Sequence, residues 1–185
     1  MGQIVIMAHI LDYITSIGMK TKIRIISLFL LLVPVYFFII GDFYGSGFQT
    51  PLFRYQEVFL GSFVVLTSND VYNIITGFFQ GTRVPAVILW CLGLILLIVN
   101  IVLLFVDKKP IQRIIRRSGI VIIVAGIFFL VSIIAYYGPL FHNTLGIALP
   151  VGLPLIFLIG IWMYLWKEEE NKTDQAEPEP QPELV

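Results

Sequence analysis

A basic stretch between two long apolar runs, DKKPIQRIIRR from Asp107 to Arg117, constrains the fold of this chain most. It sets five Lys and Arg residues against a single acid. Short loops rich in Lys and Arg stay on the cytoplasmic side of a membrane, because cations are held back by the membrane potential and attracted by anionic inner-leaflet lipids. Pro110 breaks any helix that continues from the preceding run. We therefore expect a tight cytoplasmic connection between two spanning helices.

The composition agrees with a membrane protein. Hydrophobic residues make up 58% of the chain, charged residues make up 13%, and the mean hydropathy is +0.91, values typical of the membrane class. The formal net charge is zero, and topology explains the basic stretch, so we expect no nucleic-acid partner. A single cysteine, Cys91, and two histidines far apart in the sequence, His9 and His142, do not form a recognisable metal or cofactor motif. We expect no metal and no cofactor.

Four apolar runs are each close to the roughly 20 residues that a helix needs to span a bilayer. The sequence therefore predicts an all-α integral membrane protein, a four-transmembrane-helix bundle within residues 23–166. Basic residues before the first run, Lys20, Lys22 and Arg24, place its start inside. The prediction is a multi-pass protein of the cell membrane with cytoplasmic N- and C-termini. The predicted spans are 23–41, 84–106, 118–137 and 144–166.

Prolines interrupt the first and fourth predicted spans. Pro34 lies near the middle of the first, where we expect a bend. The fourth contains Pro150 and Pro154. A helix that started at Pro154 would be too short to reach across the roughly 30 Å hydrocarbon core. We therefore expect both prolines to lie in a kinked outer half of one long helix.

The longest connection, the outer segment 42–83, is predicted to fold, because loops of more than about 15 residues without structure of their own are uncommon. Residues 52–67 are rich in Phe, Val and Tyr and are interrupted by Gly61 and Ser62, which predicts a short hairpin. A short amphipathic helix is predicted from Ser68 to Gly81, with Thr67 and Asp70 at the spacing of a capping box. Its apolar face consists of Val71, Ile74, Ile75, Phe78 and Phe79.

The two ends of the chain carry different patterns. Apolar residues at helical spacing over 4–19 predict an amphipathic helix on the cytoplasmic face, within a segment 1–22. Residues 167–185 are acidic and proline-rich and have almost nothing to bury, so we expect a disordered cytoplasmic tail.

Small residues recur seven positions apart in the third predicted span. In lipid, such residues let backbones approach closely and so favour helix packing. Asn100, the one strongly polar residue of the second span, is expected to hydrogen-bond a neighbouring helix, with a transport or ligand role as the alternative. The predicted helix-packing residues are Gly119, Ala125, Gly126, Ser132 and Asn100.

The predicted function follows from the outer segment, which is aromatic and expected to fold, whereas the predicted spans carry few polar residues. No motif of a hydrolase, metalloprotease or nucleotide-binding enzyme occurs, and no catalytic residue is assigned. We expect a non-enzymatic structural, accessory or assembly subunit that acts through its outer segment, in a homo-oligomer or a larger membrane or surface complex. The alternatives are a small pore or a lipid- or quinone-binding carrier, and then a membrane enzyme using outer-loop carboxylates. Predicted partner-binding residues are Phe53, Tyr55, Phe59, Asn73, Thr76 and Gln80.

Overall fold

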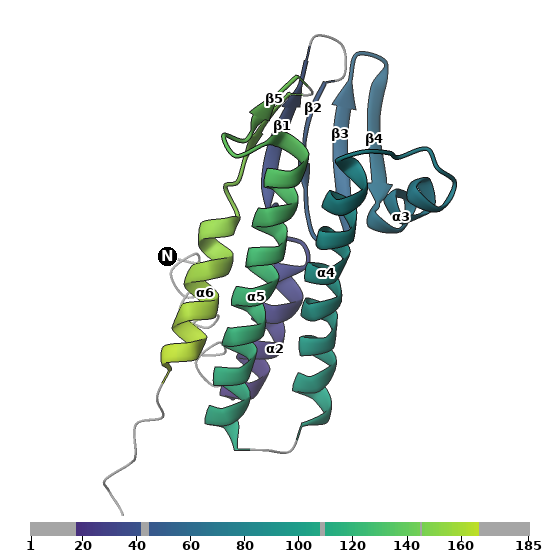
Figure 1. Ribbon diagram of the computed structural model, residues 1–185. Coiled ribbons are helices and arrows are strands. Elements are labelled where there is room, and N and C mark those ends of the chain that lie inside the picture. Colours follow the sequence, from purple (N-terminus) through teal and green to yellow (C-terminus); the bar gives the residue numbers. More distant parts are fainter. Residues whose placement is uncertain (1–17, 42–44, 108–109, 145, 167–185) are drawn as a thin grey trace, which may run out of the picture.

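Two long apolar helices form the axis of the molecule (Figure 1). The computed structural model describes residues 18–41, 45–107, 110–144 and 146–166. Within them, α4 (Arg83–Val106) has 24 residues and α5 (Ile111–Tyr137) has 27, and both are long and apolar enough to cross a membrane. They run antiparallel and pack along their length.

Two shorter helices complete the helical part. The helix α2 (Met19–Leu30) has 12 residues and lies against α4, and α6 (Leu153–Leu165) has 13 residues and packs on α5. Two side chains of α2 cap the free carbonyls at the end of α4. Lys20 Nζ donates to the Asp107 carbonyl at 2.8 Å, and Arg24 Nε donates to the Leu104 carbonyl at 3.2 Å. These bonds fix the relative height of the two helices.

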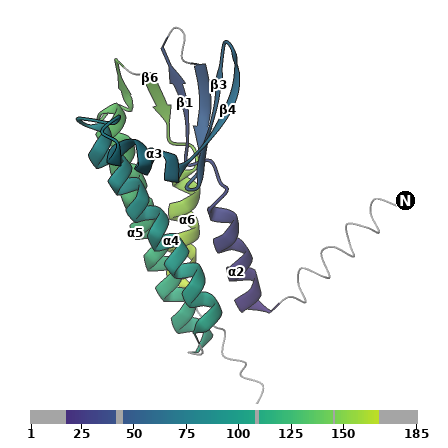
Figure 2. The ribbon, with the colours of Figure 1, turned by 90° about the vertical axis from the view of Figure 1, so that its right-hand side faces the viewer.

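A six-stranded antiparallel sheet stands at the other end of α4 and α5 (Figure 2). Its order is β4-β3-β2-β1-β6-β5. The centre is the pairing of β1 with both β2 and β6, which joins the connection before α4 to the one after α5. The strands are β1 (Tyr36–Ile40), β2 (Gly45–Gln49), β3 (Phe53–Val58), β4 (Gly61–Leu66), β5 (His142–Asn143) and β6 (Gly146–Leu149).

The sheet shows that the predicted all-α, four-transmembrane-helix bundle is wrong. The run 23–41 divides into the end of α2 and strand β1, and the run 144–166 divides into β6 and α6. Pro34 follows α2, and Pro154 lies in the first turn of α6, where a missing N–H costs nothing. The aromatic and β-branched sequence of β1, YFFII, favours a strand. The hydropathy of these runs shows that they are apolar. It does not distinguish one long helix from a shorter helix joined to a strand.

The outer segment is also larger in structure than predicted. The hairpin expected over 52–67 is β3 and β4, which turn at Phe59 and Leu60 and belong to the six-stranded sheet. The helix predicted to reach Gly81 is α3 (Thr67–Ile75), and the capping box does not form. The Thr67 hydroxyl donates instead to the Pro51 carbonyl, at 3.0 Å.

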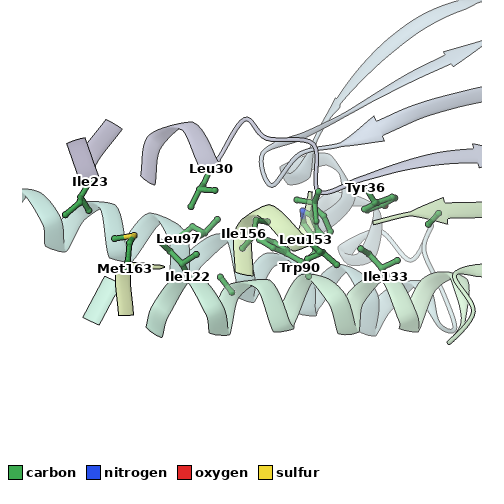
Figure 3. Close-up of a cluster of buried hydrophobic side chains, with 14 of the residues drawn as sticks. Ile23, Leu30, Tyr36, Trp90, Leu97, Ile122, Ile133, Leu153, Ile156 and Met163 are labelled. Carbon is green, nitrogen blue, oxygen red and sulfur yellow. The ribbon is translucent and has the colours of Figure 1, made fainter. Parts of the chain in front are cut away.

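The hydrophobic core runs from the helices into the base of the sheet (Figure 3). Leu30 of α2, Leu97 of α4 and Ile122 of α5 are fully buried among the helices. Tyr36 of β1 packs edge-on against Trp90 of α4, with ring centroids 5.7 Å apart. One continuous core therefore holds the sheet on α4 and α5. The predictions for residues 1–17 and 167–185 lie outside the described residues.

Candidate functional site: the outward face and free edge of the sheet

The inward face of the sheet carries a buried ion pair. Arg54 of β3 donates to Asp70 of α3 at 3.2 Å, and the Asp70 side chain is almost completely buried. Burial raises the pKa of the Asp70 carboxyl above its ordinary value, and the Arg54 guanidinium lowers it by less. The pair joins the sheet to the helix that follows it. Removing either charge would leave the other one buried without compensation.

A carbonyl next to this pair joins three elements. The Pro51 carbonyl accepts hydrogen bonds from Thr67 Oγ1 at 3.0 Å and from Trp90 Nε1 at 3.1 Å. Pro51 thereby fixes the base of the β3–β4 hairpin and the start of α3 to one turn of α4. The cavity beside it has a volume of about 40 Å³, enough for a few water molecules and too small for an organic substrate. The contacts of this cluster hold the sheet and α3 on α4.

The outer-segment charges do not converge in the way that acid–base catalysis requires. Glu57 is exposed and lies three residues after Arg54 on the same strand, so it points to the opposite face of the sheet from the Arg54–Asp70 pair. Arg83 lies over the rings of Phe79 and Tyr136, at 5.5 and 5.8 Å from their centroids. Asp42 lies outside the described residues.

The part of the outward face of the sheet that is nearer the helices is apolar, although helices cover only the inward face (Figure 2). One row of residues crosses five strands by backbone register and contains no charge. Its rings form a ladder, with Phe37 and Phe48 centroids 5.9 Å apart and Phe48 and Tyr55 stacked at 5.4 Å. A shallow hollow of about 340 Å³ lies along this face. The members of the row are Leu149, Phe37, Phe48, Tyr55 and Val64.

The next row, farther from the helices, brings the first charge on this face. It consists of Ile147, Ile39, Ser46, Glu57 and Ser62. We call the uncharged part of the face, on the helix side of Glu57, the apolar band. It consists of the row from Leu149 to Val64 together with Phe53 and Leu66, which pair at the base of the hairpin. Phe53 and Tyr55, two of the predicted partner-binding residues, belong to this band and are half-buried by their neighbours.

One edge of the sheet is free. No strand pairs with the outer side of β4 in the part of the chain that the structure describes. This strand, GSFVVL, contains no charge, and Phe63, Val64 and Leu66 are exposed. The turn before it exposes Phe59 by 94% and Leu60 by 89%. The predicted partner-binding residue Phe59 therefore lies at the tip of the free hairpin.

The helix α3 buries its one charge and exposes apolar side chains toward its end. Its buried residues are Thr67 and Asp70, and its exposed ones include Ser68 and Asn69 in the first turn and Ile75, at 77% exposure, in the last. After its last turn Phe78 is also exposed, at 75%. Two predicted partner-binding residues bond to their own segment: Thr76 Oγ1 donates to the Tyr72 carbonyl at 3.0 Å, and Gln80 Nε2 donates to the Gly77 carbonyl at 3.2 Å. Asn73, the third, is half-buried.

The predicted helix-packing residues all lie inside the bundle. A Cβ on Gly119 would be 2.6 Å from the Gly160 carbonyl oxygen and the Tyr164 nitrogen of α6. A Cβ on Gly126 would meet the side chains of Phe157 and Ile156, at 3.0 and 3.2 Å. Ala125 is fully buried, and Ser132 Oγ donates to the Ala86 carbonyl at 2.7 Å. Asn100 is 1% exposed and has no hydrogen-bond partner among the described residues, so the bond to a neighbouring helix that its sequence position predicted is not formed there.

Sequence reasoning missed β1, β2, β5 and β6, and with them three residues of the apolar band: Phe37, Phe48 and Leu149. The available signal was the strand-forming sequence YFFII directly after Pro34. Comparison of the chain with protein-family models, with curated proteins and with solved structures finds no match.

Proposed function

We propose that this protein is a non-enzymatic membrane assembly protein in which α4 and α5 cross the bilayer and the sheet, on the outer side, joins copies through the free edge of β4. The observation that carries the proposal is the uncharged, exposed and unpaired strand β4. Long apolar edge strands are ready templates for pairing with another chain, and proteins that remain monomeric protect them with charges, prolines or bulges. Within Gly61–Leu66 this chain has no charge and no proline.

The orientation follows from the distribution of cations. Lys20, Arg24, Arg113, Arg116 and Arg117 lie at the end of the helices opposite the sheet. Clusters of this kind favour the cytoplasmic side. This orientation places the sheet outside and the ends of α2 and α6 that are remote from it at the cytoplasmic face.

A second copy of this chain is the partner that β4 fits best. In a two-fold symmetric dimer each strand meets itself in the antiparallel direction, so like charges on the strand would face each other. The uncharged sequence of β4 avoids that repulsion. Phe63 and Val64, at its centre, would lie next to their counterparts and bury apolar surface that is exposed in the monomer.

The hydrogen-bond pattern shows which backbone groups are available. The amide of Thr67 donates to the Leu52 carbonyl at 2.9 Å. Because hydrogen-bonded and non-hydrogen-bonded pairs alternate in an antiparallel ladder, the amides of Phe63 and Val65 point toward β3. Those of Ser62, Val64 and Leu66 point away from it and are free to pair with another strand.

This alternation gives a sharp test. Val64→Pro removes one outward N–H without removing a bond to β3, whereas Val64→Thr keeps the N–H and nearly the same shape. In mild detergent, light scattering coupled to size exclusion should show a dimer or larger oligomer for the parent and for Val64→Thr. It should show a monomer for Val64→Pro, and circular dichroism of that variant should match the parent, which shows that the fold is retained. A monomeric parent, or a Val64→Pro variant that assembles normally, would contradict the proposal.

A further inference from the structure

The lengths of the helices conflict with a sheet that stands entirely above the membrane. The hydrocarbon core is about 30 Å thick. At 1.5 Å per residue, α2 and α6, with 12 and 13 residues, reach only about 18 and 20 Å. Each apolar run continues into a strand, β1 or β6. In the orientation proposed above, these strands must therefore begin below the outer surface of the bilayer.

The height of the sheet can be measured along α4. Arg24, the last cation before the apolar run of α2, bonds to the Leu104 carbonyl, so it marks the inner boundary at the level of Leu104. Trp90 lies 14 residues away on the same helix, which is about 21 Å higher. Trp90 bonds to the Pro51 carbonyl and contacts Tyr36. The base of the sheet is therefore about 9 Å below the outer boundary of a 30 Å core.

The outward face of the sheet has the polarity that this depth requires. From Tyr36 to the row of Ile39 and Glu57 is three residues along β1, or about 10 Å at 3.3 Å per residue. The apolar band fills this interval, and the first charged side chain on the face appears at its upper limit. The uncharged part of the outward face is therefore about as tall as the depth of the base of the sheet below the outer boundary.

The helix α3 gives a second observation, at the level of Trp90 along α4. Val71, Ile74 and Ile75 line an apolar groove with Ile88 and Cys91 of α4, which lie within three residues of Trp90. The charge of α3, Asp70, is buried against Arg54, whereas Ile75 and Phe78 are exposed. A helix on a water-exposed surface would have the opposite arrangement.

We infer that the lower half of the sheet and α3 are embedded in the outer leaflet, where the apolar band and the exposed face of α3 contact the acyl chains of lipids. The ladder bonds of the sheet satisfy the backbone of its inner strands at this depth, and the outward amides of β4 need a partner strand there. Two long helices and two helix–strand segments then make the crossing. This inference rests on the membrane orientation of the proposed function and not on its dimer.

Site-directed spin labels in lipid vesicles test the inference. Single cysteines, in a Cys91→Ser background, replace Phe53 and Ile75 in the submerged region and Phe59 at the tip of the hairpin. Ile88→Cys, on an exposed position of α4, is the matched control for depth. Collision rates with oxygen, which concentrates in lipid, and with a water-soluble nickel chelate are measured in phosphatidylcholine–phosphatidylglycerol vesicles. Labels at Ile75 and Phe59 occupy exposed positions, so they do not disturb packing.

Labels at Phe53 and Ile75 should be accessible to oxygen and shielded from nickel, like the label at Ile88, whereas a label at Phe59 should be nickel-accessible. If Phe53 and Ile75 are as accessible to nickel as Phe59, the sheet stands in water and the inference is wrong. If they are shielded from both reagents, protein covers the band and the inference is also wrong. Nickel access at Ile88 itself would instead contradict the membrane orientation.

Discussion

At the scale of single residues, the Arg54–Asp70 pair decides whether the sheet stays on the helices. We expect Arg54→Met to destabilise the protein by about 3 kcal/mol or more, because it leaves the Asp70 carboxylate buried without its partner. The double variant Arg54→Met/Asp70→Leu should recover most of that loss, because it removes both desolvated charges. Thermal unfolding in detergent measures both. A double variant that is less stable than Arg54→Met would show that the pair contributes net stability beyond its own desolvation.

Residue patterns predicted side-chain environments better than they predicted backbone conformation. The spacing of Gly119 and Gly126 indicated close packing, and the structure places both against α6. For Thr67 and Asp70, the same kind of reading failed. Their spacing predicted a cap, but tertiary partners take both side chains: the Pro51 carbonyl takes the hydroxyl, and Arg54 takes the carboxylate. Neither partner is near them in the sequence, so local spacing could not reveal the bonds.

At the scale of elements, the contact between α5 and α6 depends on backbone approach at Gly119. A methyl group there would run into backbone atoms of α6 at 2.6 Å, whereas at Gly126 it meets side chains at 3.0 Å or more, which can move. Gly119→Ala should therefore cost about 1 to 3 kcal/mol of stability, and Gly126→Ala should cost less. The melting temperatures of the two variants in detergent provide the comparison. Equal losses would mean that α6 shifts freely along α5.

The type of an element could be predicted where a long apolar run forms one helix. It could not be predicted where one apolar run contains both a helix and a strand. The apolar runs that form α4 and α5 contain no proline after the first turn, and each of them is a single helix. The run 23–41 is also strongly apolar but contains Pro34 and then YFFII, which pairs with β2 and β6. The partner β6 is more than 100 residues away. The local sequence YFFII favours a strand, but nothing in it reveals the pairing with β6, and the part of the apolar band on β1 and β6 was missed for this reason.

At the scale of the whole molecule, the proposed dimer and the proposed depth of the sheet in the bilayer support each other. The outward amides of Val64 and Leu66 belong to the lower half of β4, level with the apolar band. Unpaired backbone groups are costly in lipid, and open sheet edges do not occur in the hydrocarbon region. Pairing of β4 with a second copy would satisfy these groups at the depth where water cannot. The proposed depth of the sheet in the bilayer would therefore favour the proposed pairing of two copies.

The orientation of the whole molecule gives the last prediction. The exposed cation Arg116, which bonds to Tyr164 near the end of α6, lies at the end remote from the sheet, and Phe59 lies at the tip of the hairpin. In a Cys91→Ser background, Phe59→Cys should react with an impermeant maleimide on intact cells, and Arg116→Cys should react only after permeabilisation. Because α4 lies between these two sites along the chain, a reversed result would invert the protein in the membrane. Labelling of both sites in intact cells would mean that α4 does not cross it.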